Sequence, residues 1–142
     1  MNEISRLNQL SNTILCTVDL SESSKLTLSW AVAMAQQLKC HLTILYTYRL
    51  LHYRNGEVVQ LKKTMEDEAK QRFQLLESEF LVGKGISYDF KTEVGFVNDR
   101  IENHAKKNSL RFLVMNKNSS DSEKDGIREL MDHIHVPVLL VP

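Results

Sequence analysis

The residues best placed to hold a phosphate lie between positions 115 and 126, where the sequence reads MNKNSSDSEKDG. The segment follows an apolar run and precedes a helical pattern, where an α/β nucleotide-binding protein carries a glycine-rich loop. Glycines let backbone N–H groups turn inward and approach phosphate oxygens closely. Gly126 is the only glycine here, and three acidic side chains repel phosphate while two lysines offset them in part. The segment therefore predicts poor binding of a triphosphate.

Histidine and cysteine offer the other obvious chemistry, but their spacing predicts neither a metal site nor a reactive thiol. His133 and His135 form an H-x-H pair at the end of a helical pattern, and the other histidines stand in different elements. Interaction with the negative end of the helix dipole is the simpler explanation for this pair. Cys16 and Cys40 form no CxxC motif. Buried side chains are expected for both, with a disulfide or a reactive thiol as the alternative.

No side-chain nucleophile is visibly paired with a base and an orienting group, so the sequence predicts a protein that is not an enzyme. Its 142 residues fit one domain, with residues 1–12 as a polar extension. The 18 basic and 18 acidic residues leave no charge that would favour nucleic acid or an anionic membrane. Because no window is apolar over the length of a membrane span and no signal peptide is recognisable, a cytoplasmic location is expected.

Short apolar runs alternate with helical patterns along the whole chain, which predicts an α/β fold with a parallel sheet covered on both faces. The predicted strands are residues 13–18, 41–48, 86–94, 110–115 and 136–141, and the predicted helices are residues 25–39, 60–82, 96–108 and 126–134. Residues 49–59 are expected to form a connection with a turn at Asn55-Gly56. Trp30 is expected in the core, because it lies on the apolar face of the first helix.

Ligands of such sheets bind beyond the carboxyl ends of the strands. Those ends carry Asp19, the pair Thr47–Tyr48, Gly95 and the pair Met115–Asn116. Asp19 has two readings that the sequence leaves open. Its carboxylate can contact a ligand, or it can accept hydrogen bonds from the amides of the turn that starts the next helix.

The order of these segments resembles the universal stress protein family. Asp19 followed by LSESS is similar to the family's D-G-S-x-x-S turn, and the helix SWAVAMAQQL leads into LTILYTY as in the family. VGFVNDRIENHA resembles V-x-x-G-x-P-x-x-x-I-x-x-x-A, with Val97 in place of proline, and VPVLLVP resembles the family's final strand. The resemblance extends from Thr13 to Pro142. It implies a three-layer α/β/α, adenine nucleotide alpha hydrolase-like fold whose five parallel strands have the order 3-2-1-4-5.

Family members that bind ATP carry G-x2-G-x9-G-[ST] after the methionine of the fourth strand. Here Asn116 and Ser119 stand at the first two glycine positions, and the third glycine with its hydroxyl residue is not found at the expected spacing. The resemblance therefore implies a member without the ATP motif and without a cofactor, ATP or AMP being the less favoured alternative. The vestigial nucleotide site that it implies consists of Thr17, Asp19, Thr47, Met115, Asn116 and Ser119.

Three functions are compatible with these observations. The favoured one is a non-catalytic, dimeric stress-response regulator that contacts other proteins and does not bind ATP. An adenine-nucleotide-binding regulatory module with a degenerate phosphate loop is the alternative, and an enzyme on the same fold is the third.

The dimer interface is expected on the last strand, whose apolar side chains would be exposed at a sheet edge. Its residues are Val136, Val138, Leu139, Leu140 and Val141. The first-strand side of the sheet or the N-terminal dozen residues could cover the strand instead.

Overall fold

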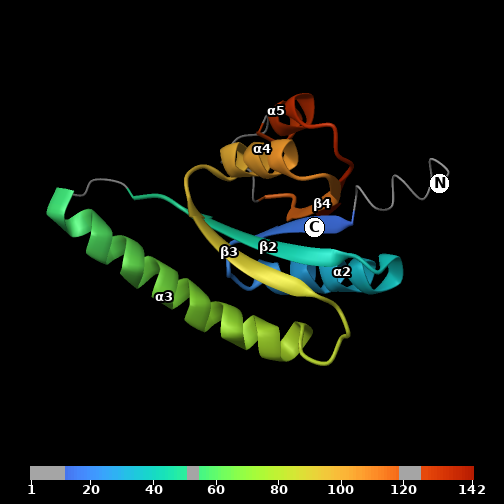
Figure 1. The fold of residues 1–142 in the computed structure, drawn as a ribbon, viewed down its shortest axis with the longest axis horizontal. Coiled ribbons are helices and arrows are strands. Elements are labelled where there is room, and N and C mark those ends of the chain that lie inside the picture. Colours follow the sequence, from blue (N-terminus) through green and yellow to red (C-terminus); the bar gives the residue numbers. More distant parts are fainter. Residues whose placement is uncertain (1–11, 51–54, 119–125) are drawn as a thin grey trace.

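The computed structural model describes residues 12–50, 55–118 and 126–142. In these residues five parallel strands form one sheet in the order β3-β2-β1-β4-β5 (Figure 1). The strands are β1 (Thr13–Val18), β2 (His41–Tyr48), β3 (Tyr88–Val94), β4 (Leu110–Asn116) and β5 (Val138–Val141). This confirms the predicted α/β class and the strand order that the family resemblance implied.

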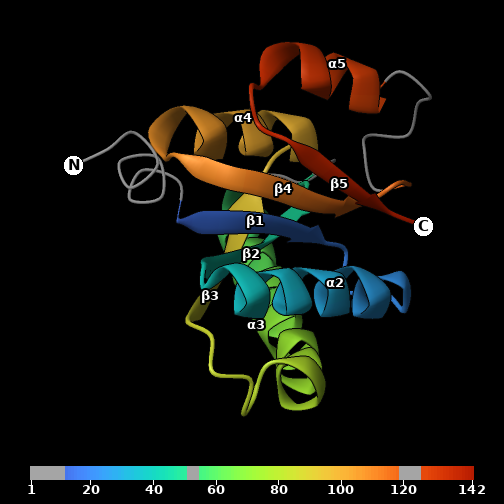
Figure 2. The same cartoon turned by 90° about the vertical axis from the view of Figure 1, so that its right-hand side faces the viewer.

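Helices cover both faces of the sheet and complete three layers. The helices are α2 (Ser23–Leu38), α3 (Asn55–Phe80), α4 (Val97–Lys107) and α5 (Gly126–His133). Figure 2 shows α4 and α5 on one side of the strands and α2 and α3 on the other. In the same view the carboxyl ends of β1 and β5 point to the right. No helix in the part of the chain that the structure describes is long and apolar enough to cross a membrane.

Two apolar layers hold these elements together, as expected for parallel strands buried on both faces. One layer joins α2 and α3 to the sheet through residues such as Leu28, Phe73 and Ile44. The other joins α4 and α5 to the opposite face through Ile101 and Leu130, among others. Alternate residues of each strand enter opposite layers, so the strand pattern itself creates both cores.

Trp30 is 49% exposed on α2, so the prediction of a core tryptophan was wrong. The sheet contacts are made by Ala31 and Ala35, which are fully buried. Small side chains let the helix approach the sheet closely, and a residue one position away is rotated by about 100° around the helix axis. Leu26, 47% exposed, lies one turn before Trp30 and shares its outward direction.

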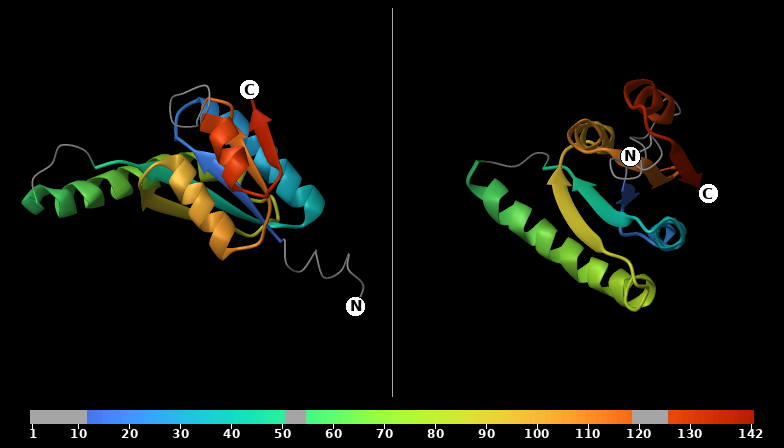
Figure 3. Two further views of the ribbon diagram at one scale, coloured as in Figure 1. Left: turned by 90° about the horizontal axis from the view of Figure 1, so that it is seen from above. Right: turned by 45° about the vertical axis from the view of Figure 1, so that its right-hand side comes forward.

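The helix α3 starts at Asn55, where the sequence predicted a turn inside a longer connection. An Asn-Gly pair favours a hairpin only between two strands, and here helix-forming residues follow it. Figure 1 shows the first part of α3 extending past the sheet, and the right-hand view of Figure 3 shows the helix running along β3. The rings of Phe73 and Phe90 stack there at 4.1 Å. This contact fixes α3 against the edge strand.

The strand β5 lies at the edge of the sheet and begins at Val138, two residues later than the sequence predicted. Its side chains are more covered than expected. Val141 is 2% exposed, Val138 and Leu139 are half-buried, and Leu140 is 39% exposed. The expectation that the whole run would be exposed was therefore wrong, because the two helical layers reach the edge strand.

Candidate functional site

A pocket of about 200 Å³ opens where β1 and β2 end and where β3 turns into α4. Three residues of the predicted nucleotide site, Thr17, Asp19 and Thr47, line it together. Its other lining residues are Val18, Tyr48, Arg49, Gly95 and Val97. The structure thus brings part of the predicted set to one place, at the edge where parallel sheets bind ligands.

Asp19 holds the turn between β1 and α2. Its Oδ1 accepts hydrogen bonds from the Ser21 amide at 2.9 Å, the Ser21 hydroxyl at 2.5 Å and the Ser24 hydroxyl at 2.8 Å. The Ser24 oxygen in turn accepts the amides of Asp19 and Leu20. Asp19 therefore stabilises the turn, as one of the two interpretations of the sequence expected. All three of these hydrogen bonds end on the same carboxylate oxygen.

The pKa of Asp19 is the result of two opposing effects. Partial burial raises the pKa of its carboxyl group, and the hydrogen bonds from Ser21 and Ser24 lower it. The hydrogen bonds dominate, so the pKa lies below its ordinary value of 3.8. The pocket therefore contains a carboxylate that stays ionised at neutral pH.

The pocket contains one buried polar atom without a hydrogen-bond partner among the described residues, Thr17 Oγ1. Tyr48 Oη, which also belongs to the lining, interacts with Glu66: burial and this neighbouring carboxylate raise the pKa of the Tyr48 hydroxyl to about 12. An unpaired buried polar group costs about 1–3 kcal/mol, so Thr17 Oγ1 is a feature of a site that a ligand or water completes.

Arg49 lines the pocket and contacts Phe96, and neither residue was among the predicted site residues. The Arg49 Cζ atom lies 4.6 Å from the centre of the Phe96 ring, a cation–π contact. Gly95 between the strand and the helix has a φ of 135°, and a side chain there would meet Arg100. The positions of Arg49 and Phe96, directly after β2 and directly before α4, were the available signal in the sequence.

Met115 and Asn116, at the end of β4, are not among the residues that line the pocket. Met115 is fully buried in the layer beneath α4 and α5. Asn116 is 8% exposed, and its Oδ1 accepts the Asn118 amide at 2.8 Å. Its φ is not positive, unlike that of a glycine in a phosphate loop. Ser119, the last residue of the predicted set, lies outside the described residues.

The cysteines and His133 of the H-x-H pair agree with the simpler interpretations of the sequence. Both cysteines are free and buried, which excludes the disulfide, and burial raises the pKa of the Cys16 thiol to about 12. Such a thiol is unreactive at neutral pH. His133 Nδ1 lies 2.7 Å from the Glu129 carbonyl in the last turn of α5. Among the residues described, no three metal-ligating side chains converge.

One constellation was missed by the sequence reasoning, which found no nucleophile beside a base. At the opposite, amino edge of the sheet, His41 Nδ1 lies 2.9 Å from the Ser87 hydroxyl and His41 Nε2 lies 2.7 Å from Asp89 Oδ1. The three residues are far apart in sequence and meet only because β2 pairs with β3. Register across two strands is a long-range property, so no local motif could have indicated it.

Several solved structures with the same fold are universal stress proteins. UspA from Lactobacillus plantarum superposes with a TM-score of 0.77 at 19% identity, covering 92% of this chain and 97% of that one. A universal stress protein in complex with cAMP superposes with a TM-score of 0.61 at 19% identity, covering 93% of this chain and 97% of that one. The universal stress protein from Archaeoglobus fulgidus in complex with dAMP superposes with a TM-score of 0.63 at 13% identity, covering 94% of this chain and 99% of that one.

The family comparison is more specific than these structural likenesses. No curated protein sequence matches this chain significantly. The model of the universal stress protein family matches residues 11–142, which include every strand and helix described above and all the residues that line the pocket. The chain therefore belongs to the universal stress protein family.

Proposed function

We propose that this protein is a non-catalytic, dimeric stress-response regulator that does not hold ATP. The observation that carries the proposal is the hydrogen bond from the Asn118 amide to Asn116 Oδ1. A phosphate loop needs free backbone amides that turn toward the ligand. Here the side chain that replaces the first glycine has taken up an amide of its own segment.

The size and charge of the pocket support the same conclusion. Sites for drug-sized ligands have volumes of about 300–1,000 Å³, and the pocket beside Thr17 has about 200 Å³. That volume suits a nucleoside or a part of one better than a triphosphate. The ionised carboxylate of Asp19 adds negative charge, which disfavours three phosphates nearby.

The proposed dimer forms through β5. Among the described residues β5 is the last strand of the sheet and pairs only with β4, so the backbone groups of its outer edge could pair with a second copy. Leu140 adds an exposed apolar side chain, and α2, which carries the exposed Trp30, contacts β5. Antiparallel pairing of two β5 strands across a two-fold axis would bury both features in one isologous interface.

A second candidate function is binding of a small adenine ligand as a regulatory signal. The buried, unpaired Thr17 Oγ1 in the pocket favours it, because a ligand hydroxyl or ring nitrogen would satisfy this atom. Relatives with the same fold are described in complex with cAMP and dAMP, at identities of 19% and 13%. Such a ligand would need the pocket and not the loop after β4.

Titration calorimetry with adenosine, AMP and Mg-ATP separates the two candidates. Binding of none of the three supports the ligand-free regulator. Binding of adenosine or AMP that Thr17→Val weakens supports the second candidate, while Thr43→Val, whose hydroxyl lies elsewhere and bonds Asp89, is the matched control. Tight binding of ATP alone would contradict both.

A further inference from the structure

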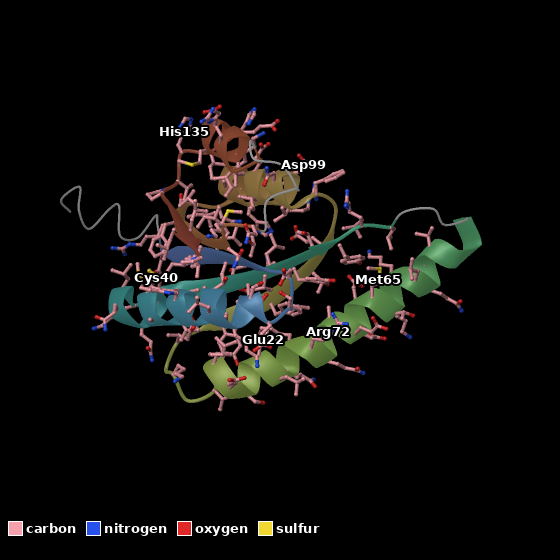
Figure 4. All side chains as sticks on the ribbon, turned by 180° about the vertical axis from the view of Figure 1, so that it is seen from behind. Glu22, Cys40, Met65, Arg72, Asp99 and His135 are labelled. Atoms are coloured by element: carbon pink, nitrogen blue, oxygen red, sulfur yellow. The ribbon has the colours of Figure 1, made fainter. Side chains whose placement is uncertain are left out.

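The amino edge of the sheet carries a linear array of a hydroxyl, an imidazole and a carboxylate. The Ser87 hydroxyl lies 2.9 Å from His41 Nδ1, and His41 Nε2 lies 2.7 Å from Asp89 Oδ1. The proposed function uses none of these residues. Cys40, labelled in Figure 4 at the end of α2, immediately precedes His41 and marks this edge, far from the pocket at the carboxyl ends.

The backbone holds the three side chains in place. Leu42 pairs with Tyr88, and the Leu42 amide donates to the Ser87 carbonyl at 3.0 Å, which fixes Ser87 opposite His41. Asp89 is held from a second side, since Thr43 Oγ1 donates to its Oδ1 at 2.8 Å. His41 and Asp89 therefore lie in paired strands, and Ser87, which directly precedes β3, is held beside them by the hydrogen bond from the Leu42 amide. Rigid elements are the support that a reactive site requires.

The arrangement selects one tautomer of the imidazole. An ionised carboxylate can only accept hydrogen bonds, so His41 Nε2 must carry the proton that it shares with Asp89. His41 Nδ1 then presents its lone pair to Ser87, and the serine hydroxyl donates to it. This is the relation between a nucleophile, its general base and the group that orients the base.

A second pocket, of about 630 Å³, opens beside the serine. Lys39 and Lys84 line it, and neither forms an ion pair with any residue that the structure describes. Two unpaired ammonium groups favour a substrate that is anionic or that releases an anion. The backbone amides of Gly85 and Ile86, adjacent to Ser87, donate no hydrogen bond within the described residues and can stabilise a developing oxyanion.

We propose that Ser87 is an acyl-accepting nucleophile, with His41 as its general base and Asp89 as the positioning group, and that its donors are small acyl phosphates. Ser87 Oγ attacks the acyl carbon while its proton passes to His41 Nδ1. The bond from the acyl carbon to the phosphate oxygen then breaks, and phosphate leaves with the electron pair, taking the proton from His41. The products are the serine ester and inorganic phosphate, and no oxidation or reduction occurs.

The test is acetylation of the full chain by acetyl phosphate, followed over time by peptide mass spectrometry. We expect acetyl-Ser87 to form faster than acetylation at any other serine. His41→Gln should slow its formation by a factor on the order of 10², the usual contribution of a general base. Asp89→Asn should also slow it, while the melting temperature shows that the variant is folded. Ser87→Ala should abolish the product.

Two matched controls make the result decisive. Ser78 is an exposed serine whose hydroxyl bonds a helix carbonyl, and His133 is an exposed histidine without a serine partner. Ser78→Ala and His133→Gln should leave Ser87 acetylation unchanged. Acetylation of Ser87 no faster than that of Ser78 would overturn the proposal, as would acetyl groups on Lys39 or Lys84 alone. Equal rates in wild type and a folded His41→Gln variant would overturn it as well.

Discussion

Asp19 connects the stability of the β1–α2 turn to pH. Its pKa is lower in the folded protein than its ordinary value of 3.8, because Ser21 and Ser24 donate hydrogen bonds to the ionised form. A group with a depressed pKa stabilises the fold above its unfolded pKa, and this contribution is lost as the pH falls through the folded value. The stabilisation is therefore complete at neutral pH and disappears only in acid.

Substitutions at Asp19 should show this dependence. Asp19→Ala should lower the free energy of unfolding by about 1 kcal/mol at neutral pH, and Asp19→Asn by less, because asparagine still accepts the Ser21 amide. Melting curves between about pH 6 and about pH 3 should show wild type losing its advantage over Asp19→Asn. An advantage that grows in acid would contradict this account of the turn.

Thr17 should show the opposite pattern, in which removing a polar group costs no stability. Its hydroxyl is buried without a partner in the described residues, so Thr17→Val should leave stability unchanged or raise it by about 1 kcal/mol. Thr43→Val removes a hydroxyl that donates to Asp89 at 2.8 Å and should cost about 1 kcal/mol. Chemical denaturation measures both, and equal losses would show that Thr17 has a partner.

At the scale of elements, α3 and β3 depend on each other. The edge strand contacts the helix through the Phe73–Phe90 stack, a 2.6 Å hydrogen bond from Tyr88 to Glu77 and a 3.1 Å hydrogen bond from Thr92 to Glu66. Phe73→Ala should cost about 3–5 kcal/mol by leaving a cavity. Leu75→Ala, at a position 74% exposed on the same helix, should change stability by less than about 0.5 kcal/mol. Urea denaturation measures the free energy of unfolding of both variants, and similar losses would contradict the packing of Phe73 against β3.

The elements also show which parts of the fold a sequence can reveal. Strands such as β1 and β2 were predicted with the observed bounds, because a run buried on both faces has a strong local signature. Trp30 was misplaced because the apolar stripe of α2 is wider than the face that contacts the sheet. The start of α3 was missed because the Asn55-Gly56 pair indicates a turn only when strands flank it, and here a helix follows. The sequence predicted that Thr17, Asp19 and Thr47 lie together, because the ends of strands can be located in a sequence. It did not predict the contacts of His41 with Ser87 and Asp89, because these depend on the register between two strands.

At the scale of the whole molecule, the edge strand predicts a dimer. Sedimentation at micromolar concentration should give twice the 16.4 kDa of one chain. Leu140→Lys should convert the protein to monomers, because it places an unpaired charge in the interface. The fold of each copy should survive, since the Leu140 side chain is exposed in the single chain. Leu75→Lys, on the exposed side of α3, is the matched control and should remain dimeric. A wild-type monomer, or a dimer that Leu140→Lys leaves intact, would refute an interface on β5.

The proposal that this protein does not hold ATP can be tested by its melting temperature with Mg-ATP. A ligand at 100 times its Kd stabilises the folded state by about 2.7 kcal/mol, which would raise the melting temperature of a chain of this size by roughly 10 °C. We predict that saturating Mg-ATP leaves the melting temperature of the wild-type protein unchanged within about 1 °C. A rise of several degrees with Mg-ATP, absent with magnesium and inorganic triphosphate, would contradict the account.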